Sequence, residues 1–239
     1  MATLDSYTDL YDIPQELKDF RDTIRQIVKE RVWPRAAEID ATGDYPWDLR
    51  KLFGEQDILG LPFAEEYGGT GTGTLMLNMA VEEIAKVDAA CALILMVQEL
   101  GTLPIQLFGT DELKERFLPR CATGEFSPAF ALSEPEAGSD PAGMKTTAVK
   151  DGDEWVINGT KNWISNLGIA DFYITFAVTD RESRRITAFE DTAMHGAMPG
   201  MAPALTFPYA FPRPGRYRMW VQVRRGGRIL TGAFDLQVN

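Results

Sequence analysis

Apolar side chains recur at three- and four-residue steps through the first half of the chain. The clearest stripe lies between Pro14 and Pro34, and this spacing predicts an amphipathic helix. Pro14 stands where a helix begins, because a first-turn residue needs no amide hydrogen bond. Pro34 is expected to end or kink the helix. The apolar positions of the stripe are Leu17, Phe20, Ile24, Ile27, Val28 and Val32.

Three more helices are expected before residue 125. The patterns predict a short helix over 48–56 and a strongly apolar one over 75–100 whose second half is almost wholly buried. A last helix begins near Asp111, which can cap it. The glycine-rich segment EEYGGTGTGTL lies between helices and lacks the Gly-Lys-Ser/Thr ending of a phosphate loop, so it is interpreted as a connector. Residues 1–124 are thus predicted to form a helical bundle domain.

The period of the pattern changes from helical to two after Gly124. The run 129–132 is expected to enter as a buried strand, and DFYITFAVTD is a further strand. In DEWVINGTKNWIS we expect two strands around an Asn158–Gly159 turn, because Asn-Gly readily adopts positive φ. Residues 125–190 are predicted to form a middle, β-barrel-like domain.

The last segment, residues 191–239, differs again in composition. It is rich in Met, Pro and Gly up to Gly215, and then the pattern predicts strands over 217–224 and 229–238 around Gly226-Gly227. We interpret it as a β-hairpin tail unrelated to the preceding domain. The expected fold class is therefore α+β.

Charge and composition exclude several classes of partner. The 239 residues are 45% hydrophobic, enough for real cores, and carry a formal net charge of −11, which opposes nucleic acid and anionic lipid. The N-terminus lacks the pattern of a secretory leader, and the longest apolar run, 89–97, is too short to cross a bilayer. Cys91 and Cys121 are expected to be buried thiols. These features favour a cytoplasmic protein that contacts no membrane.

A metal site finds little support in the sequence. The single histidine, His195, lies near Met194, Met198 and Met201, which together could hold copper(I). The irregular spacing within a Pro- and Gly-rich stretch favours a linker instead. No second histidine is present for a hydrolytic triad or a zinc site.

Two segments together have the chemistry of a site for a large flat ligand. AFALSEPEAGSDPAG, residues 129–143, combines apolar, hydroxyl and small side chains, and KNWISN adds Trp163 and Ser165. Trp163 alone would be interpreted as core. Taken together, the segments offer an apolar wall, hydroxyl donors and an open glycine turn, which suit a heteroatom-edged ring with phosphates.

The same residues resemble the FAD-dependent acyl-CoA dehydrogenase family. The stretch from Ala131 to Gly143 satisfies every position of the family's first signature. GDEWVINGTKNWISN, PFAEEYGG and LFGTDELKERFLP are similar to further landmarks in the family's order. The likeness covers about residues 10 to 190.

The resemblance implies positions for the cofactor. In the family, the stretch matching Phe130 to Ser139 lines FAD, and the tripeptide matching Trp163 to Ser165 lies along the flavin with the Ser165 hydroxyl facing N5. A hydrogen-bond donor there favours the charge that builds as hydride arrives. The residues expected at FAD are Phe130, Leu132, Ser133, Gly138, Ser139, Trp163, Ile164 and Ser165.

The resemblance also implies a reaction and its partners. It is the α,β-dehydrogenation of a saturated acyl-CoA thioester to the trans-2-enoyl-CoA, with electron-transfer flavoprotein as the acceptor and a homo-oligomeric enzyme. Ser139, Gln98 and Glu99 are the expected substrate contacts.

The likeness ends near Phe189, before the family's third, helical domain, which supplies the carboxylate base. No catalytic residue and no metal ligand are therefore assigned within the 239 residues, and we expect a truncated or fused chain that is weakly active or inactive alone. The alternative is a non-catalytic flavin-binding or protein-interaction scaffold.

Overall fold

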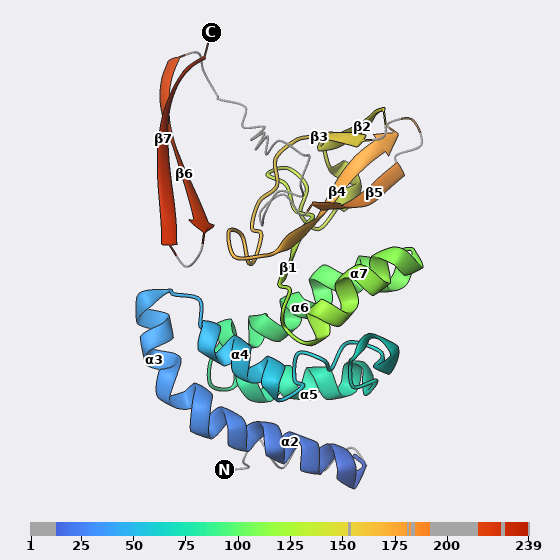
Figure 1. The fold of residues 1–239 in the computed structure, drawn as a ribbon, viewed down its shortest axis with the longest axis vertical. Helices are drawn as coiled ribbons and strands as arrows, with labels where there is room; N and C mark the ends of the chain where they lie inside the picture. Colours follow the sequence, from blue (N-terminus) through green and yellow to red (C-terminus); the bar gives the residue numbers. More distant parts are fainter. Residues whose placement is uncertain are drawn as a thin grey trace. The chain divides into compact units, whose positions relative to one another are not determined.

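The computed structural model describes residues 13–152, 154–180, 182, 185–191, 215–225 and 228–238. The chain divides into two compact units, Met1–Phe126 and Ser127–Asn239. Helices make up the first unit and strands the second (Figure 1). The predicted α+β class, with helices first and sheet second, is confirmed.

The first helix begins where the sequence predicts it. Pro14 occupies the N-cap position of α2, Gln15–Ile27, which continues through the π-helical turn Val28–Val32 into α3, Trp33–Thr42. Pro34 lies in the first turn of α3, and α3 leaves the direction of α2 in Figure 1. The predicted kink is confirmed, because the π-helical turn just before Pro34 shifts the register of the helix.

The apolar segment 75–100, predicted as one helix, is two. It is divided between α5, Gly73–Ala85, and α6, Ala89–Phe108. The side chain of Asp88 accepts a hydrogen bond from the Cys91 amide at 2.7 Å and so starts a new helix. The single-helix prediction was wrong because this cap outweighs the continuous apolar pattern.

The prediction that the second half of the segment 75–100, now the first part of α6, is almost wholly buried was also wrong. Its residues alternate between buried positions and an exposed apolar stripe. The expectation that no apolar segment is long enough to cross a bilayer was wrong for α6, which alone among the helices of the described residues is long and apolar enough by length and composition. Half of its apolar window is buried. The exposed stripe consists of Leu93, Met96, Leu100, Leu103 and Leu107.

The remaining helices of the first unit agree closely with the sequence patterns. They are α4, Trp47–Glu55, and α7, Asp111–Ala122. The N-cap of α7 is Thr110, whose hydroxyl accepts from the Leu113 amide, and not Asp111 as expected. The glycine-rich segment connects α4 to α5 through the 3-10 turn Glu65–Tyr67, as predicted.

One apolar core joins these helices. It draws on α2, the π-helical turn, α3, α4, the segment that follows α4, α5 and α6. Val32, Phe53, Leu59 and Ile84 are fully enclosed in it. Cys91 and Cys121 are buried thiols, as expected.

The second unit is a mixed five-stranded sheet. Its strands are β1, Pro128–Ala131; β2, Thr147–Asp151; β3, Glu154–Asn158; β4, Phe172–Asp180; and β5, Arg185–Asp191. The order is β1-β4-β2-β3, with β5 also paired to β4. β1 runs parallel to β4, so a long connection must lead from one to the other. The first predicted motif, residues 129–143, extends from β1 into the turn that follows it. The second, with Trp163 and Ser165, lies in the last part of the connection before β4.

The predicted hairpin around Asn158–Gly159 was wrong. β3 pairs with the preceding strand β2, and the turn is the two-residue connection between Asp151 and Glu154, where Gly152 has φ +60°. Residues 160–165 are not a strand. Gly159 is instead required for close approach, because a Cβ there would lie 2.2 Å from Oγ1 and 2.6 Å from Cα of Thr146.

Substituting Gly159 with alanine should therefore destabilise the second unit. We expect a loss of about 1–3 kcal/mol in the free energy of unfolding, the usual cost of overpacking a buried contact. Gly143→Ala is the matched control, since a Cβ there meets nothing within 4 Å. Denaturant titration measures both, and equal stability of the two variants would contradict the prediction.

The backbone of the C-terminal hairpin follows the prediction. β6, Gly215–Arg225, pairs antiparallel with β7, Arg228–Val238, and Arg225 lies opposite Arg228 across the expected Gly-Gly connection. His195 and the methionines around it lie outside the described residues.

Candidate functional site

The two predicted motifs lie against one another in the second unit. The segment that leaves β1 and the connection 159–171 are joined by backbone contacts: the Asn162 amide donates to the Ser133 carbonyl at 2.8 Å. Lys161 Nζ donates to the Leu132 carbonyl at 3.0 Å. We call these two segments, 127–146 and 159–171, the joined loops.

The joined loops are also fastened at the start of β1. The Ser127 amide donates to Asp171 Oδ2 at 2.6 Å, and the Asp171 amide donates to the Ser127 carbonyl at 2.7 Å. Asn166 Nδ2 donates to the Pro128 carbonyl at 3.0 Å and to Ser127 Oγ at 3.3 Å. Contacts at both ends fix the register of one loop against the other.

Glu134 is the buried centre of this arrangement. The residue is buried, and its carboxylate accepts from Lys161 Nζ at 2.8 Å, the Lys145 amide at 2.6 Å and the Thr146 amide at 3.0 Å. Burial raises the pKa of Glu134, but hydrogen bonds from Lys145, Lys161 and Thr146 outweigh it, so the pKa falls to about 2. Glu134 is therefore a charged structural group and not a proton acceptor near neutral pH.

A tight turn presents the small residues of the signature. Glu134 and Ala137 exchange backbone hydrogen bonds of 2.9 and 3.2 Å, and Gly138 and Ser139 follow, both exposed. A Cβ added at Gly138 would meet nothing within 4 Å, so its backbone is open to a ligand. A cavity of about 480 Å³ adjoins this turn; its lining is Asp140, Ala142, Gly143, Met144, Lys145, Thr147 and Val178.

Trp163 projects from the second of the joined loops. Its side chain is 90% exposed and its φ is +60°, a left-handed conformation that is rare for a bulky residue. Ile164 is half-buried and Ser165 is exposed. The interpretation of Trp163 as a core residue, left open by the sequence, is wrong. A strained, exposed aromatic side chain held by buried contacts is typical of a ligand site.

The remaining predicted residues divide between the two units. Phe130 lies on β1 and packs against Phe176, with ring centroids 4.9 Å apart. Leu132 and Ser133 are half-buried in the joined loops, where the predicted cofactor residues are thus brought together. Gln98 and Glu99, by contrast, lie on α6 in the first unit.

Gln98 and Glu99 differ sharply in their surroundings. The Gln98 side chain is buried, accepts from Arg50 Nη1 at 3.1 Å and donates to the carbonyls of Cys121 and Phe126. The carboxylate of Glu99 is half-buried and has no hydrogen-bond or ion-pair partner among the residues that the structure describes. Burial raises its pKa.

The sequence analysis did not identify the two buried residues that support the joined loops, Glu134 and Lys161. Lys161 stands in the quoted hairpin motif and Glu134 in the signature, yet neither was assigned a role. A signal was present for Lys161, which is the only charged residue between Glu154 and Asp171. Glu134 is one of three carboxylates in 129–143, so the sequence does not distinguish it. In the described part of the chain no group of three or more His, Cys, Asp or Glu side chains could hold a metal ion.

Comparison with known families agrees with this geometry. The family model for the acyl-CoA dehydrogenase N-terminal domain matches residues 14–125, and that for the middle domain matches residues 129–203. A domain of unknown function, DUF8832, matches residues 174–239, so its match begins within β4 and includes the hairpin β6–β7.

Individual relatives give the same result. A probable acyl-CoA dehydrogenase of Mycobacterium tuberculosis is 39% identical over 76% of this chain and 47% of its own length. The butyryl-CoA dehydrogenase of Megasphaera elsdenii is 36% identical, with a TM-score of 0.70 over 76% of this chain and 49% of that one. A glutaryl-CoA dehydrogenase of Mycobacterium smegmatis, solved in complex with FADH2, is 29% identical, with a TM-score of 0.72 over 95% of this chain and 53% of that one.

The two family models define the chain as a helical N-terminal domain followed by a middle domain of the acyl-CoA dehydrogenase type. The chain belongs to the acyl-CoA dehydrogenase family. It spans about half the length of the curated relatives that it matches.

Proposed function

We propose that the second unit binds FAD on the joined loops, and that the chain takes part in the α,β-dehydrogenation of a saturated acyl-CoA thioester. The observation that carries the proposal is the pair of hydrogen bonds from Asn162 and Lys161 to the segment 131–143. These bonds hold that segment against the loop in which Trp163 is exposed. The proposed FAD contacts are Phe130, Leu132, Ser133, Gly138, Ser139, Trp163, Ile164 and Ser165.

The residues present fit this cofactor. Trp163 offers a flat, exposed apolar face, and a ligand that covered this face would gain free energy by removing it from water. The exposed hydroxyls of Ser139 and Ser165 and the open backbone at Gly138 supply donors and close approach for polar ring edges and phosphates. FAD, when bound, supplies the hydride acceptor for the oxidation.

The chain's own groups would orient the reactants more than transform them. The Ser165 hydroxyl is a donor toward charge that develops on a bound ring, an effect that is strongest where water is excluded. Glu134, bound to Lys161 and two amides, holds the loops and does not exchange protons near neutral pH.

We propose the α6 surface of the first unit as the contact for the acyl chain. Met96, Leu100 and Leu103 are exposed apolar side chains on that helix, and Glu99 lies among them in sequence. Gln98, whose amide is fully engaged, would act by fixing the helix. Ser139 would contact the bound acyl-CoA. Electron-transfer flavoprotein as electron acceptor and a cytoplasmic location belong to the same proposal.

Adding FAD should quench tryptophan emission, and Trp163→Phe should remove most of that change. The physical reason is stacking of the flavin on the exposed indole. Trp155→Phe is the matched control, because Trp155 packs against Phe189 at 5.2 Å in the same unit. A quench that survives intact in Trp163→Phe would place FAD away from the joined loops.

The reaction is tested separately, by anaerobic mixing of the FAD-loaded chain with short-, medium- and long-chain saturated acyl-CoA. Loss of flavin absorbance together with enoyl-CoA formation supports dehydrogenation. The chain alone is expected to show little of either change, and a family C-terminal domain joined after Phe189 should restore both. Binding of FAD and acyl-CoA with neither change in that fusion would favour the non-catalytic scaffold.

A further inference from the structure

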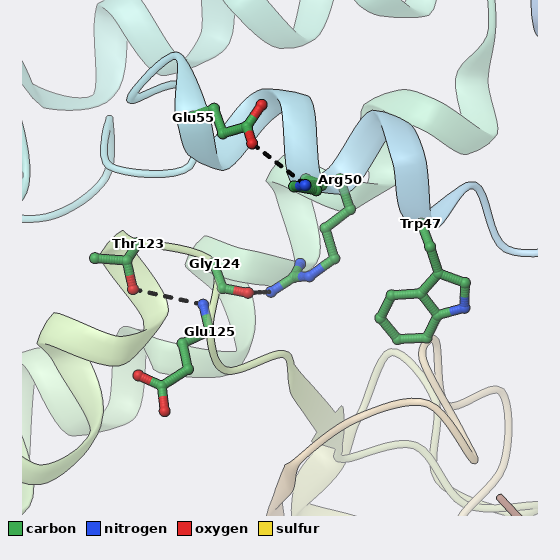
Figure 2. Close-up of a pocket in the computed structure, with 7 residues that line it drawn as sticks. Trp47, Arg50, Glu55, Thr123, Gly124 and Glu125 are labelled. Carbon is green, nitrogen blue, oxygen red and sulfur yellow. Dashed lines mark hydrogen bonds and ion pairs between the residues drawn. The ribbon is translucent and has the colours of Figure 1, made fainter. Parts of the chain in front are cut away.

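The first unit has a cavity beside α4 that the proposed function does not use. Its volume is about 420 Å³, within the range of small-molecule sites, and Figure 2 shows its lining side chains. α4 contributes four residues and the segment after α7 the other three. They are Trp47, Arg50, Lys51, Glu55, Thr123, Gly124 and Glu125.

Arg50 is a buried cation with only neutral partners in the described part of the chain. It is 4% exposed, and it donates to Gln98 Oε1 at 3.1 Å and to the carbonyls of Gly124 at 3.3 Å and Phe126 at 2.7 Å. A guanidinium has five N–H donors, so two have no described acceptor. Because a buried charge is costly without a counter-ion, Arg50 favours an anion in the cavity.

The carboxylates that line the cavity are already matched to other cations. Glu55 lies 3.6 Å from Lys51 Nζ, and Glu125 accepts from Arg120 Nε at 2.9 Å. The hydrogen bond from Arg120 lowers the pKa of Glu125, so this group is ionised at neutral pH. Neither carboxylate forms an ion pair with Arg50 in the described structure. Their negative charge would nevertheless oppose a ligand that carries more than one.

Trp47 adds an apolar wall to the same cavity. It is 41% exposed and extends from the same side of α4 as Arg50 in Figure 2. A half-exposed indole one helical turn from a buried guanidinium offers a surface for a flat ring and a partner for its charge.

We propose that this cavity binds a small aromatic monocarboxylate, with the carboxylate on Arg50 and the ring against Trp47. Guanidinium and carboxylate are complementary in shape and charge. The ring would pack on the exposed part of Trp47, whose indole also contacts Tyr45 with ring centroids 4.8 Å apart. The single charge fits a cavity lined by Glu55 and Glu125. The site is independent of the residues proposed to contact FAD.

Titration of the 239-residue chain with benzoate tests the proposal, with calorimetry and Trp47 emission as readouts. We expect a dissociation constant on the order of 1 mM, as for a ligand of this size. Benzamide, the uncharged analogue, should bind at least about tenfold more weakly, because it loses the charge-assisted hydrogen bonds. Inorganic phosphate should bind more weakly than benzoate, since it lacks the ring.

Substitutions in and outside the cavity show whether benzoate binds there or elsewhere on the protein. Arg50→Met should weaken benzoate binding about tenfold or more. If that variant does not fold, Glu125→Gln carries the test: removing a lining charge should tighten binding about 1.5- to 5-fold. Glu112→Gln, an exposed carboxylate in the first turn of α7 outside the cavity, is the matched control and should change nothing.

Four results would overturn the proposal, and three of them concern benzoate. They are no binding of benzoate at 20-fold the expected constant, equal binding of benzoate and benzamide, and equal affinities in Glu125→Gln and Glu112→Gln. Phosphate binding tighter than benzoate would likewise exclude an aromatic ligand.

Discussion

Lys161→Met is expected to lower the free energy of unfolding of the second unit by about 3–5 kcal/mol, the cost of removing one partner from a buried ion pair. Lys161 Nζ reaches Glu134 Oε1 at 2.8 Å, and their side chains are 10% and 4% exposed. Without the cation, the Glu134 carboxylate would remain buried with its charge uncompensated. The Leu132 carbonyl would also lose its 3.0 Å donor.

The same variant should lose FAD affinity by at least about tenfold, since 1.4 kcal/mol is sufficient for that factor. Lys161 binds one of the joined loops to the other at two acceptors, and the proposed FAD contacts lie on both loops. Loosening this attachment separates the signature turn from Trp163. The cofactor would then have to order the loops as it binds, at a cost in affinity.

Lys145→Met is the matched control for this experiment. Lys145 lies in the same unit and forms an ion pair with Glu136, but both side chains are well exposed, so we expect less than about 1 kcal/mol. Amide hydrogen exchange over 127–171 together with FAD titration measures both effects. If Lys161→Met and Lys145→Met behave alike, the buried pair does not hold the joined loops.

A double variant sharpens the interpretation. Lys161→Met combined with Glu134→Gln removes the uncompensated charge as well as its partner, so part of the lost stability should return. A double variant less stable than Lys161→Met would show that Glu134 contributes mainly through the Lys145 and Thr146 amides.

Local patterns predicted elements better than they predicted how the elements meet. The stripe from Leu17 to Val32 identified α2, because a helical period is a property of neighbouring residues. The break between α5 and α6 was missed, since one capping carboxylate, Asp88, decided it inside a continuous apolar run. A strong average pattern can conceal a single residue that ends a helix.

The errors in the second unit have a different cause. Asn158–Gly159 has the composition of a hairpin turn, yet Gly159 is small because Thr146 lies against it. The turn formed at Gly152, one strand earlier. Some glycines are required because a neighbour lies too close for a side chain, and others because the backbone has a positive φ. The two kinds look the same in the sequence, and only the tertiary structure distinguishes them.

The candidate site was partly predictable for the same reasons. Phe130, Ser133 and Trp163 were predicted from the chemistry of their runs together with the family resemblance, and their contact with a ligand stays a prediction. Their fixed arrangement depends on Glu134 and Lys161, which are 27 residues apart in the chain. Nothing in either local segment specifies that pairing, so the supporting contacts became visible only in the folded structure.

Acidification should destabilise the second unit through Glu134. Its pKa is about 2 in the folded chain, against an ordinary value of 4.5, so folding favours the ionised form. The stabilisation is fully present above about pH 5 and is lost as the pH falls from 4.5 toward 2. The difference amounts to about 3 kcal/mol, at 1.36 kcal/mol for each pKa unit.

Glu134→Gln should remove this part of the pH dependence. The amide cannot ionise, so the variant starts less stable at neutral pH but loses less between pH 5 and pH 2. The readout must be local, because Glu83 of the first unit also has a lowered pKa, held down by Arg25 and Lys86 against the effect of burial, and so destabilises that unit in acid. Amide exchange over 127–171 at stepwise pH supplies it, with the Lys145 and Thr146 amides as direct reporters of the carboxylate. Parallel pH profiles for the native chain and Glu134→Gln would mean that the buried carboxylate does not control the acid stability of the joined loops.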